Sequence, residues 1–174
     1  DPSPDGEYLL TEIIHRPYSY SLPQNRFPTR IEVWDLDRRE VIHQVADLPL
    51  QDQIPIAFGS VPTGPRSVRW RNDVGAQLVW AEALDGGDGG AEAEWRDRVF
   101  TLDAPFDDAP RELITLANRY GGVTWGDDEL AFVSSWWWKT RNVRKWLVQP
   151  DHRDREPRLV EDRSWQDRYD DPGR

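Results

Sequence analysis

The feature that most constrains the fold of this chain is a pattern that occurs three times: a short turn containing Asp or Asn, followed by an apolar strand. The copies are SPDGEYLLTEI from Ser3, WRNDVGAQLVWAEA from Trp70 and WGDDELAFVSS from Trp125, so their starts are 67 and 55 residues apart. Each copy is followed by a strand ending in Asp and then by another apolar strand. Four short strands repeating every 40–50 residues or so are typical of β-propeller blades, and we attribute the longer period here to loop insertions.

The segments between the turns have the pattern of strands. Most are short, rich in β-branched or aromatic residues and bounded by Gly, Pro, Asp or Asn. Only residues 109–120, APRELITLANRY, are also compatible with a short helix. The sequence therefore predicts an all-β fold with ten or eleven strands, as a partial β-propeller of about three consecutive four-stranded antiparallel blades.

The repeats also predict the boundaries of the blades. SVRW (67–70) and GGVTW (121–125) precede the second and third turns and are interpreted as inner strands, whereas only Asp1 and Pro2 precede the first turn. We therefore expect the first blade to lack its inner strand. The predicted units are an incomplete blade at 1–49, a connector at 50–66, a second blade at 67–120, a third blade at 121–164 and a tail at 165–174 that leads to further blades.

Composition excludes several classes of function. Cysteine is absent, so disulfides, thiolate zinc sites and a cysteine nucleophile are excluded. The net charge of −10 disfavours nucleic acid as a partner, and no apolar run has the length needed to cross a membrane. The 174 residues contain no methionine, from which we expect a fragment or a processed product.

Long, irregular segments resemble a known family. RFPTRIEVWDLD, VPTGPRSVRWR, RDRVFTLDAPFDDAPREL and YGGVTWGDDELAFVSSWWWKTR are similar to the propeller of serine peptidases of the prolyl oligopeptidase family, in its glutamyl endopeptidase branch. The resemblance implies an N-terminal propeller that gates and positions a peptide substrate for a C-terminal α/β-hydrolase domain carrying Ser, Asp and His. It implies peptide and that domain as partners, no cofactor, and a cytoplasmic location for a bacterial protein or a plastid location for a plant one.

The catalytic machinery of such a peptidase is not found in this sequence. No G-x-S-x-G motif occurs, and the three histidines have no Ser and Asp partners at a recognisable spacing. No catalytic residue is therefore assigned, and we expect the chain alone to be inactive. The alternative is a free-standing propeller-like module that binds a protein or a ligand. The sequence following Arg174 discriminates the two, by further blades and a nucleophile elbow or by closure of the ring.

Loop lengths indicate which end of the blades is functional. The loops predicted on one face are long: 15–29, 85–97, 136–142 and the connector 49–66. The turns predicted on the other face are short. Because binding residues are usually carried by loops on a rigid scaffold, we expect the first face to meet substrate and the hydrolase domain.

Six residues of this face are candidates for contact with substrate or with the second domain: Arg16, Tyr18, Tyr20, Arg26, Lys139 and Arg141. An arginine here could form a bidentate ion pair with a substrate carboxylate. The competing interpretation is stacking of Arg and Tyr within a proline-braced loop.

Two further motifs of the same face have structural interpretations. Alternation sends Trp137 to one side of its strand and Trp136 and Trp138 to the other, and at least one of the three is expected to pack between blades. DGGDGG (85–90) resembles a calcium-binding repeat but occurs once. We therefore expect a flexible loop tip and no metal site.

The open ends of the predicted blades should promote self-association of the chain. A strand edge without a partner and an apolar sheet face both promote association. We expect self-association through the edge of residues 7–13 and through the exposed face of the third blade, unless further chain covers them.

Overall fold

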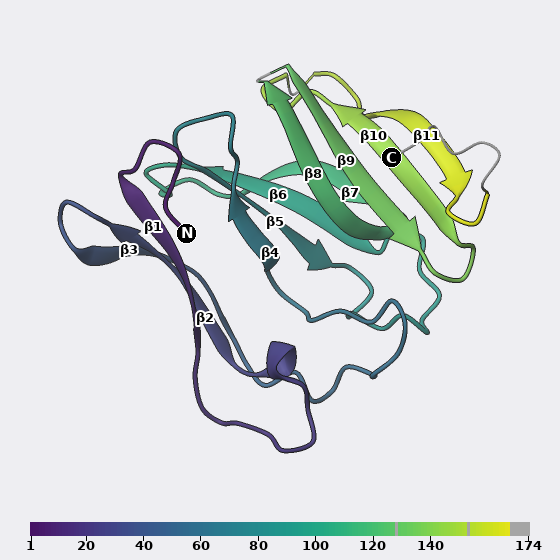
Figure 1. Ribbon diagram of the computed structural model, residues 1–174, viewed down its shortest axis with the longest axis horizontal. Coiled ribbons are helices and arrows are strands. Elements are labelled where there is room, and N and C mark those ends of the chain that lie inside the picture. Colours follow the sequence, from purple (N-terminus) through teal and green to yellow (C-terminus); the bar gives the residue numbers. More distant parts are fainter. Residues whose placement is uncertain (128, 153, 168–174) are drawn as a thin grey trace.

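The computed structural model describes residues 1–127, 129–152 and 154–167, and this part of the chain is all-β, as predicted (Figure 1). It contains eleven strands and one three-residue 3-10 helix, η1 (Gln24–Arg26). The strands are β1 (Tyr8–Ile14), β2 (Thr29–Asp35), β3 (Glu40–Leu48), β4 (Arg66–Trp70), β5 (Gln77–Ala83), β6 (Asp97–Asp103), β7 (Arg111–Leu116), β8 (Arg119–Asp127), β9 (Leu130–Trp137), β10 (Asn142–Val148) and β11 (Arg158–Ser164). Most of the predicted tail, residues 165–174, lies outside the described residues.

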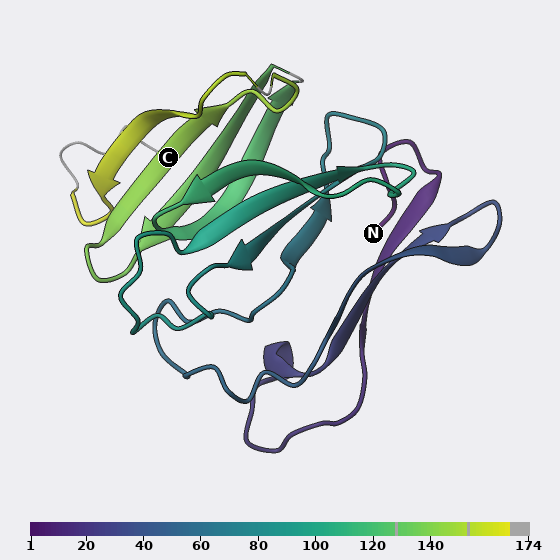
Figure 2. The ribbon, with the colours of Figure 1, turned by 180° about the vertical axis from the view of Figure 1, so that it is seen from behind.

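The strands form three antiparallel sheets, each built from strands consecutive in the chain. Their orders are β1-β2-β3, β4-β5-β6-β7 and β8-β9-β10-β11. The sheets lie side by side in chain order, and the second sheet is in the middle in both the front and the back views (Figures 1 and 2). This arrangement is consistent with consecutive blades of a propeller-like fold.

The first sheet has three strands, and the chain start occupies the place of a fourth. Pro2 forms an isolated bridge with Leu9. The amide of Leu10 donates to the carbonyl of Asp1 at 2.9 Å, and the amide of Ser3 donates to the carbonyl of Tyr8 at 2.9 Å. The expected absence of a full inner strand is therefore confirmed, and three residues cover only the first part of the edge of β1.

The seam between the first and second sheets is apolar and aromatic. Buried side chains of both sheets form one cluster: Leu10, Ile31, Val33, Val68, Trp70, Leu78, Trp80, Leu102 and Phe106. Burying a large apolar side chain contributes about 1.5–3 kcal/mol, so this cluster stabilises the contact between the two sheets. The edge-to-face contact of Tyr8 with Phe106, with ring centroids 5.3 Å apart, adds directional packing.

The seam between the second and third sheets uses smaller side chains. Its buried cluster is Val79, Ala81, Val99, Ile114, Leu116, Ala131, Val133 and Val148. The alternation in β9 explains the contribution of the third sheet, because Ala131, Val133, Ser135 and Trp137 are buried while their neighbours are more exposed. The segment that was compatible with a helix supplies Ile114 and Leu116 at the two-residue spacing of a strand, and the chain then bends before β8 begins at Arg119.

The outer face of the third sheet exposes apolar side chains, as expected. The exposed fractions are 37% for Leu130, 38% for Phe132 and 41% for Trp165. Trp137 is buried on the opposite face and Trp125 packs against the cluster shared with the second sheet. The exposed apolar face of the third sheet is therefore formed by residues other than Trp125 and Trp137. Self-association through it stays a prediction.

In the described part of the chain, no helix is long and apolar enough to cross a membrane.

Candidate functional site: the loop face

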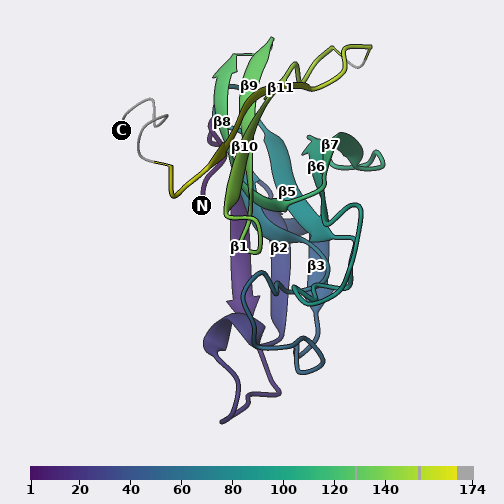
Figure 3. The same ribbon diagram turned by 90° about the vertical axis from the view of Figure 1, so that its right-hand side faces the viewer.

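Four loops form one surface at the end of the sheets, which we call the loop face: residues 15–28, 49–65, 84–96 and 138–141. The amide of Val61 donates to the carbonyl of Gly87 at 3.0 Å, and the amide of Gly89 donates to Ser60 Oγ at 3.3 Å. Lys139 Nζ reaches the carbonyl of Gly90 at 3.5 Å. The long loop between β1 and β2 extends furthest, at the lower end in Figure 3. The prediction that these loops share a face is confirmed by their contacts.

Arg26 is buried and holds the connector. Its side chain donates to the carbonyls of Ile54 at 2.8 Å and Pro55 at 3.1 Å, and the residue is only 6% exposed. The sequence interpretation of Arg26 as an outward-facing contact is therefore corrected: its donors are used inside the chain. Proline and aromatic neighbours in the sequence gave no indication of carbonyl partners some thirty residues away.

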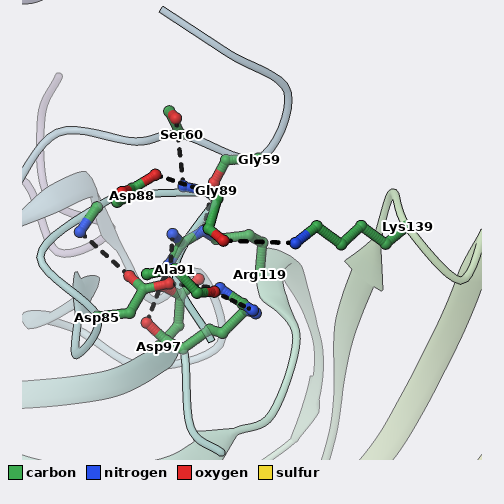
Figure 4. A network of polar contacts seen from close by, with 12 residues as sticks. Gly59, Ser60, Asp85, Asp88, Gly89, Ala91, Asp97, Arg119 and Lys139 are labelled. Carbon is green, nitrogen blue, oxygen red and sulfur yellow. Dashed lines mark hydrogen bonds and ion pairs between the residues drawn. The ribbon is translucent and has the colours of Figure 1, made fainter. Parts of the chain in front are cut away.

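A buried cluster of charges lies beneath the loops, and we call it the ionic cluster: Arg66, Asp85, Arg96, Asp97 and Arg119. Figure 4 shows Asp85, Asp97 and Arg119 of this cluster. Arg119 donates to Asp85 Oδ2 at 2.8 Å, to Asp97 Oδ1 at 2.9 Å and to the carbonyl of Gly59 at 2.7 Å. The side chains of Arg119, Asp85 and Asp97 are at most 1% exposed. Because a buried charge without a partner is costly, these side chains constrain one another strongly.

The ionic cluster joins four segments that are distant in sequence. Arg66 begins β4 and pairs with Asp97, which begins β6 and also accepts the amide of Tyr120 in β8 at 2.5 Å. Arg96 pairs with Asp85 at 2.7 Å and donates to the carbonyl of Ala91 at 2.9 Å. The cluster therefore fixes the connector, the loop 84–96 and the start of β8 relative to one another.

The glycine-rich segment DGGDGG is packed against the connector and is not an exposed tip. Gly87 and Gly89 are buried. A Cβ atom at Gly87 would overlap the carbonyl oxygen of Val61, and one at Gly89 would overlap that of Phe58. The expectation of a flexible loop tip is wrong, because these glycines allow two backbones to approach closely.

The three adjacent tryptophans belong mostly to a strand. Trp136 and Trp137 end β9, so the loop predicted at 136–142 is reduced to 138–141. Trp137 is 6% exposed, and the guanidinium of Arg96 lies 3.6 Å from the centroid of its ring. This contact between the second and third sheets confirms that at least one tryptophan packs between blades.

The remaining candidates from the sequence are exposed and spread over the loop face. Arg16, Lys139 and Arg141 are exposed, and the exposed fraction of Tyr18 is 58%. Tyr20 is fully exposed. Phe58, which was not selected from the sequence, is 79% exposed. The structure brings Lys139 near Trp138, whose ring centroid is 5.7 Å from Nζ.

His15 lies at the base of the loop between β1 and β2. Its Nδ1 lies 2.8 Å from the carbonyl oxygen of Arg16, and its Nε2 lies 2.8 Å from Asp47 Oδ1. The carbonyl and then the carboxylate raise the pKa of His15 above its ordinary value, since both favour a proton on the ring nitrogen they face.

Two arrangements typical of catalytic sites are absent from the described residues. None of their hydrogen bonds joins a serine to a histidine, and they contain no group of three His, Cys, Asp or Glu side chains placed to hold a metal ion. The loop face, which exposes aromatic and basic side chains, is therefore the candidate binding surface of the described residues.

Two curated plant proteins are similar to this chain over nearly all of its length. Both are named "Probable glutamyl endopeptidase, chloroplastic", one from Oryza sativa subsp. japonica and one from Arabidopsis thaliana, and each is 47% identical over 175 aligned positions. The alignments cover 99% of this chain but 19% and 18% of the relatives, so the chain spans about a fifth of the length of the curated relatives that it matches. No protein-family model and no solved structure matches the chain.

Proposed function

We propose that this chain is the non-catalytic, propeller-like portion of a serine peptidase of the prolyl oligopeptidase family, and that it gates and positions peptide substrate for a hydrolase domain on the same polypeptide. The observation that carries the proposal is the 47% identity over 99% of the chain to plant proteins named glutamyl endopeptidase. Cleavage after Glu is proposed from those names alone.

The loop face supports the proposal as the side that meets substrate and hydrolase domain. It carries exposed aromatic and apolar side chains, with exposed fractions of 58% for Tyr18, 72% for Ile56 and 79% for Phe58. Such a patch is typical of an interaction surface. The ionic cluster beneath it holds the loops in one arrangement, which favours binding because little order has to be gained when a partner docks.

The experiment uses the longer polypeptide that carries this chain. A serine-directed organophosphate should label it stoichiometrically, and it should cleave short peptides containing Glu. The 174-residue chain alone should be neither labelled nor active. Absence of labelling and of cleavage in the longer polypeptide would overturn the proposal and favour the alternative, a propeller-like binding module without a catalytic domain.

A further inference from the structure

A cavity of about 290 Å³ lies away from the loop-face candidates, between β4 of the second sheet and β8 of the third. Val79, Val123 and Trp125 contribute apolar walls, and Arg69, Asn72 and Tyr120 contribute polar groups. Gly121 and Gly122 form one side with backbone only. The cavity therefore combines apolar walls with a few donors, as sites for small groups do.

Arg69 is the cation of this cavity and differs from the arginines before and after it, Arg66 at the start of β4 and Arg71 just after its end. Arg66 pairs with Asp97, and Arg71 pairs with Asp73 at 2.8 Å and with Asp151 at 3.2 Å. Arg69 lies between them in sequence, is exposed, and has no carboxylate partner among the described residues. In a chain of net charge −10, a cation left without an internal anion in a cavity wall is available to an external one.

The Tyr120 hydroxyl provides a second donor at the same place. Burial raises the pKa of Tyr120 to about 12, against the opposing influence of Arg69 and Arg66, so the hydroxyl keeps its proton at neutral pH. In the described part of the chain no group accepts a hydrogen bond from it. A guanidinium and a neutral hydroxyl together match a carboxylate, which accepts from several donors at once.

We propose that this cavity binds the side-chain carboxylate of an acidic residue in a bound polypeptide, with Arg69 as the pairing cation. Trp125 would cover the methylene stem of that side chain, and the Arg69 guanidinium would bind its carboxylate in bidentate geometry. The proposal rests on the proposed peptide-binding function. It adds an acidic subsite on the seam between two sheets, apart from Arg16, Lys139 and Arg141.

The test measures binding in the longer polypeptide by titration calorimetry, after its reactive serine has been blocked with an organophosphate. Three capped or uncapped pentapeptides serve as probes: one with a central Glu and capped ends, one with a central Gln and capped ends, and one with a central Gln and a free terminal carboxylate. The variants are Arg69→Gln, Arg69→Lys and, as a matched control, Arg39→Gln, which removes an exposed arginine of the β2–β3 turn.

The Glu peptide should bind the unaltered protein about tenfold more tightly than the capped Gln peptide, as expected for one charge-assisted pair. Arg69→Gln should abolish that preference without changing the affinity for the Gln peptide, Arg69→Lys should keep part of it, and Arg39→Gln should keep all of it. Equal binding of Glu and Gln peptides, or a preference that survives Arg69→Gln, would overturn the proposal.

Two further measurements separate a side-chain subsite from a chain-end subsite, and the acidic subsite from the proposed peptidase activity. A free terminal carboxylate that binds as tightly as the Glu peptide, and through Arg69, would reassign the cavity to chain ends and overturn the side-chain proposal. Organophosphate labelling reports on the proposed peptidase separately. A protein that is not labelled but prefers Glu through Arg69 would refute the peptidase and retain the acidic subsite.

Discussion

The two seams of the molecule are held by different physical forces. Between the first and second sheets, large apolar and aromatic side chains meet, among them Trp70, Trp80 and Phe106. Between the second and third sheets, the apolar cluster is made of smaller residues, and charges close the seam at both ends: the ionic cluster at the loop face, and Arg71 with Asp151 at the opposite face. Apolar contact is nondirectional, whereas paired charges accept only one geometry.

The difference between the apolar seam and the charged seam indicates where precise geometry is needed in this fold. The charged seam fixes β8, the connector and the loop 84–96, and it contains the proposed acidic subsite. A buried ion pair adds little net stability, but removing one partner is costly. We therefore expect the two seams to respond differently to substitutions that change chemistry and to those that change only shape.

The largest effect is expected for Asp97→Asn. The substitution keeps the size of the side chain but leaves Arg66 and Arg119 without their shared carboxylate in a buried site. We expect a loss of about 3–5 kcal/mol in the free energy of unfolding, measured by urea unfolding. Asp37→Asn, in an exposed turn, is the matched control and should change little; a similar small change for Asp97 would contradict the role of the cluster.

A pair of conservative substitutions sharpens the comparison. Arg119→Lys keeps the charge but cannot reach Asp85, Asp97 and the carbonyl of Gly59 together, so about 2 kcal/mol or more should be lost. Leu78→Met, in the apolar seam, conserves volume and should cost less than about 1.5 kcal/mol. Equal costs in thermal or urea unfolding would remove the distinction between the seams.

A smaller effect is expected where the glycine-rich loop meets the connector. Gly89→Ala should cost about 1–3 kcal/mol, because the new methyl group overlaps the carbonyl of Phe58 and a backbone has to move. In Gly90→Ala the methyl group meets only the side chain of Asp88, at 3.1 Å, so the cost should be near zero. Hydrogen exchange of the amides at 58–61 and 87–89 should report the local loosening, and unchanged protection would show that the close approach is unimportant.

The smallest effect concerns pH. The pKa of His15 is raised by the carbonyl of Arg16 and by Asp47, so its contribution to stability is present below the unfolded pKa of about 6.5 and is lost as the pH rises through the folded pKa. Burial in the apolar seam lowers the pKa of His43, so stability falls as the pH drops below about 6.5 and His43 is driven to charge.

Proton resonances of the two rings should separate these cases in a titration. His15 should titrate at the higher pH, and Asp47→Asn should lower its pKa while leaving that of His43 unchanged. The reverse order of the two midpoints would contradict the structure at both places.

The sequence predicted the strands well because each repeat carries its own evidence. Alternation in β2, β6 and β9 and the Asp-containing turns are local signals, and even the ambiguous segment at 109–120 resolved into β7 and the start of β8 by the same period of two. The loop predicted at 136–142 was too long: the tryptophans alternate as the sequence indicates, but the strand that they belong to, β9, continues to Trp137.

The ionic cluster and the acidic subsite could not be predicted in this way. Arg66, Asp97 and Arg119 each begin a strand, where a charged residue usually faces solvent, and their partners are 22 to 60 residues away. The sequence indicated that Asp85 belongs to a flexible glycine-rich loop and that Arg26 is an exposed cation of the loop between β1 and β2. Only the packing of separate sheets shows which of these charges face inward, and that Arg69 has no carboxylate partner in the part of the chain that the structure describes.

The most direct test of the proposed gating function is the dependence of cleavage on substrate size in the longer polypeptide. We expect capped peptides of about ten residues with a single Glu to be cleaved. The same sequence placed in an exposed loop of a folded protein should be cleaved at least 100-fold more slowly in kcat/KM, because the substrate has to pass a gating domain that restricts access. This factor corresponds to about 2.7 kcal/mol at 1.36 kcal/mol per tenfold. Asp97→Asn, by loosening the loop face, should narrow that ratio. Equal kcat/KM values for the free peptide and the folded substrate would contradict a gating role for this chain.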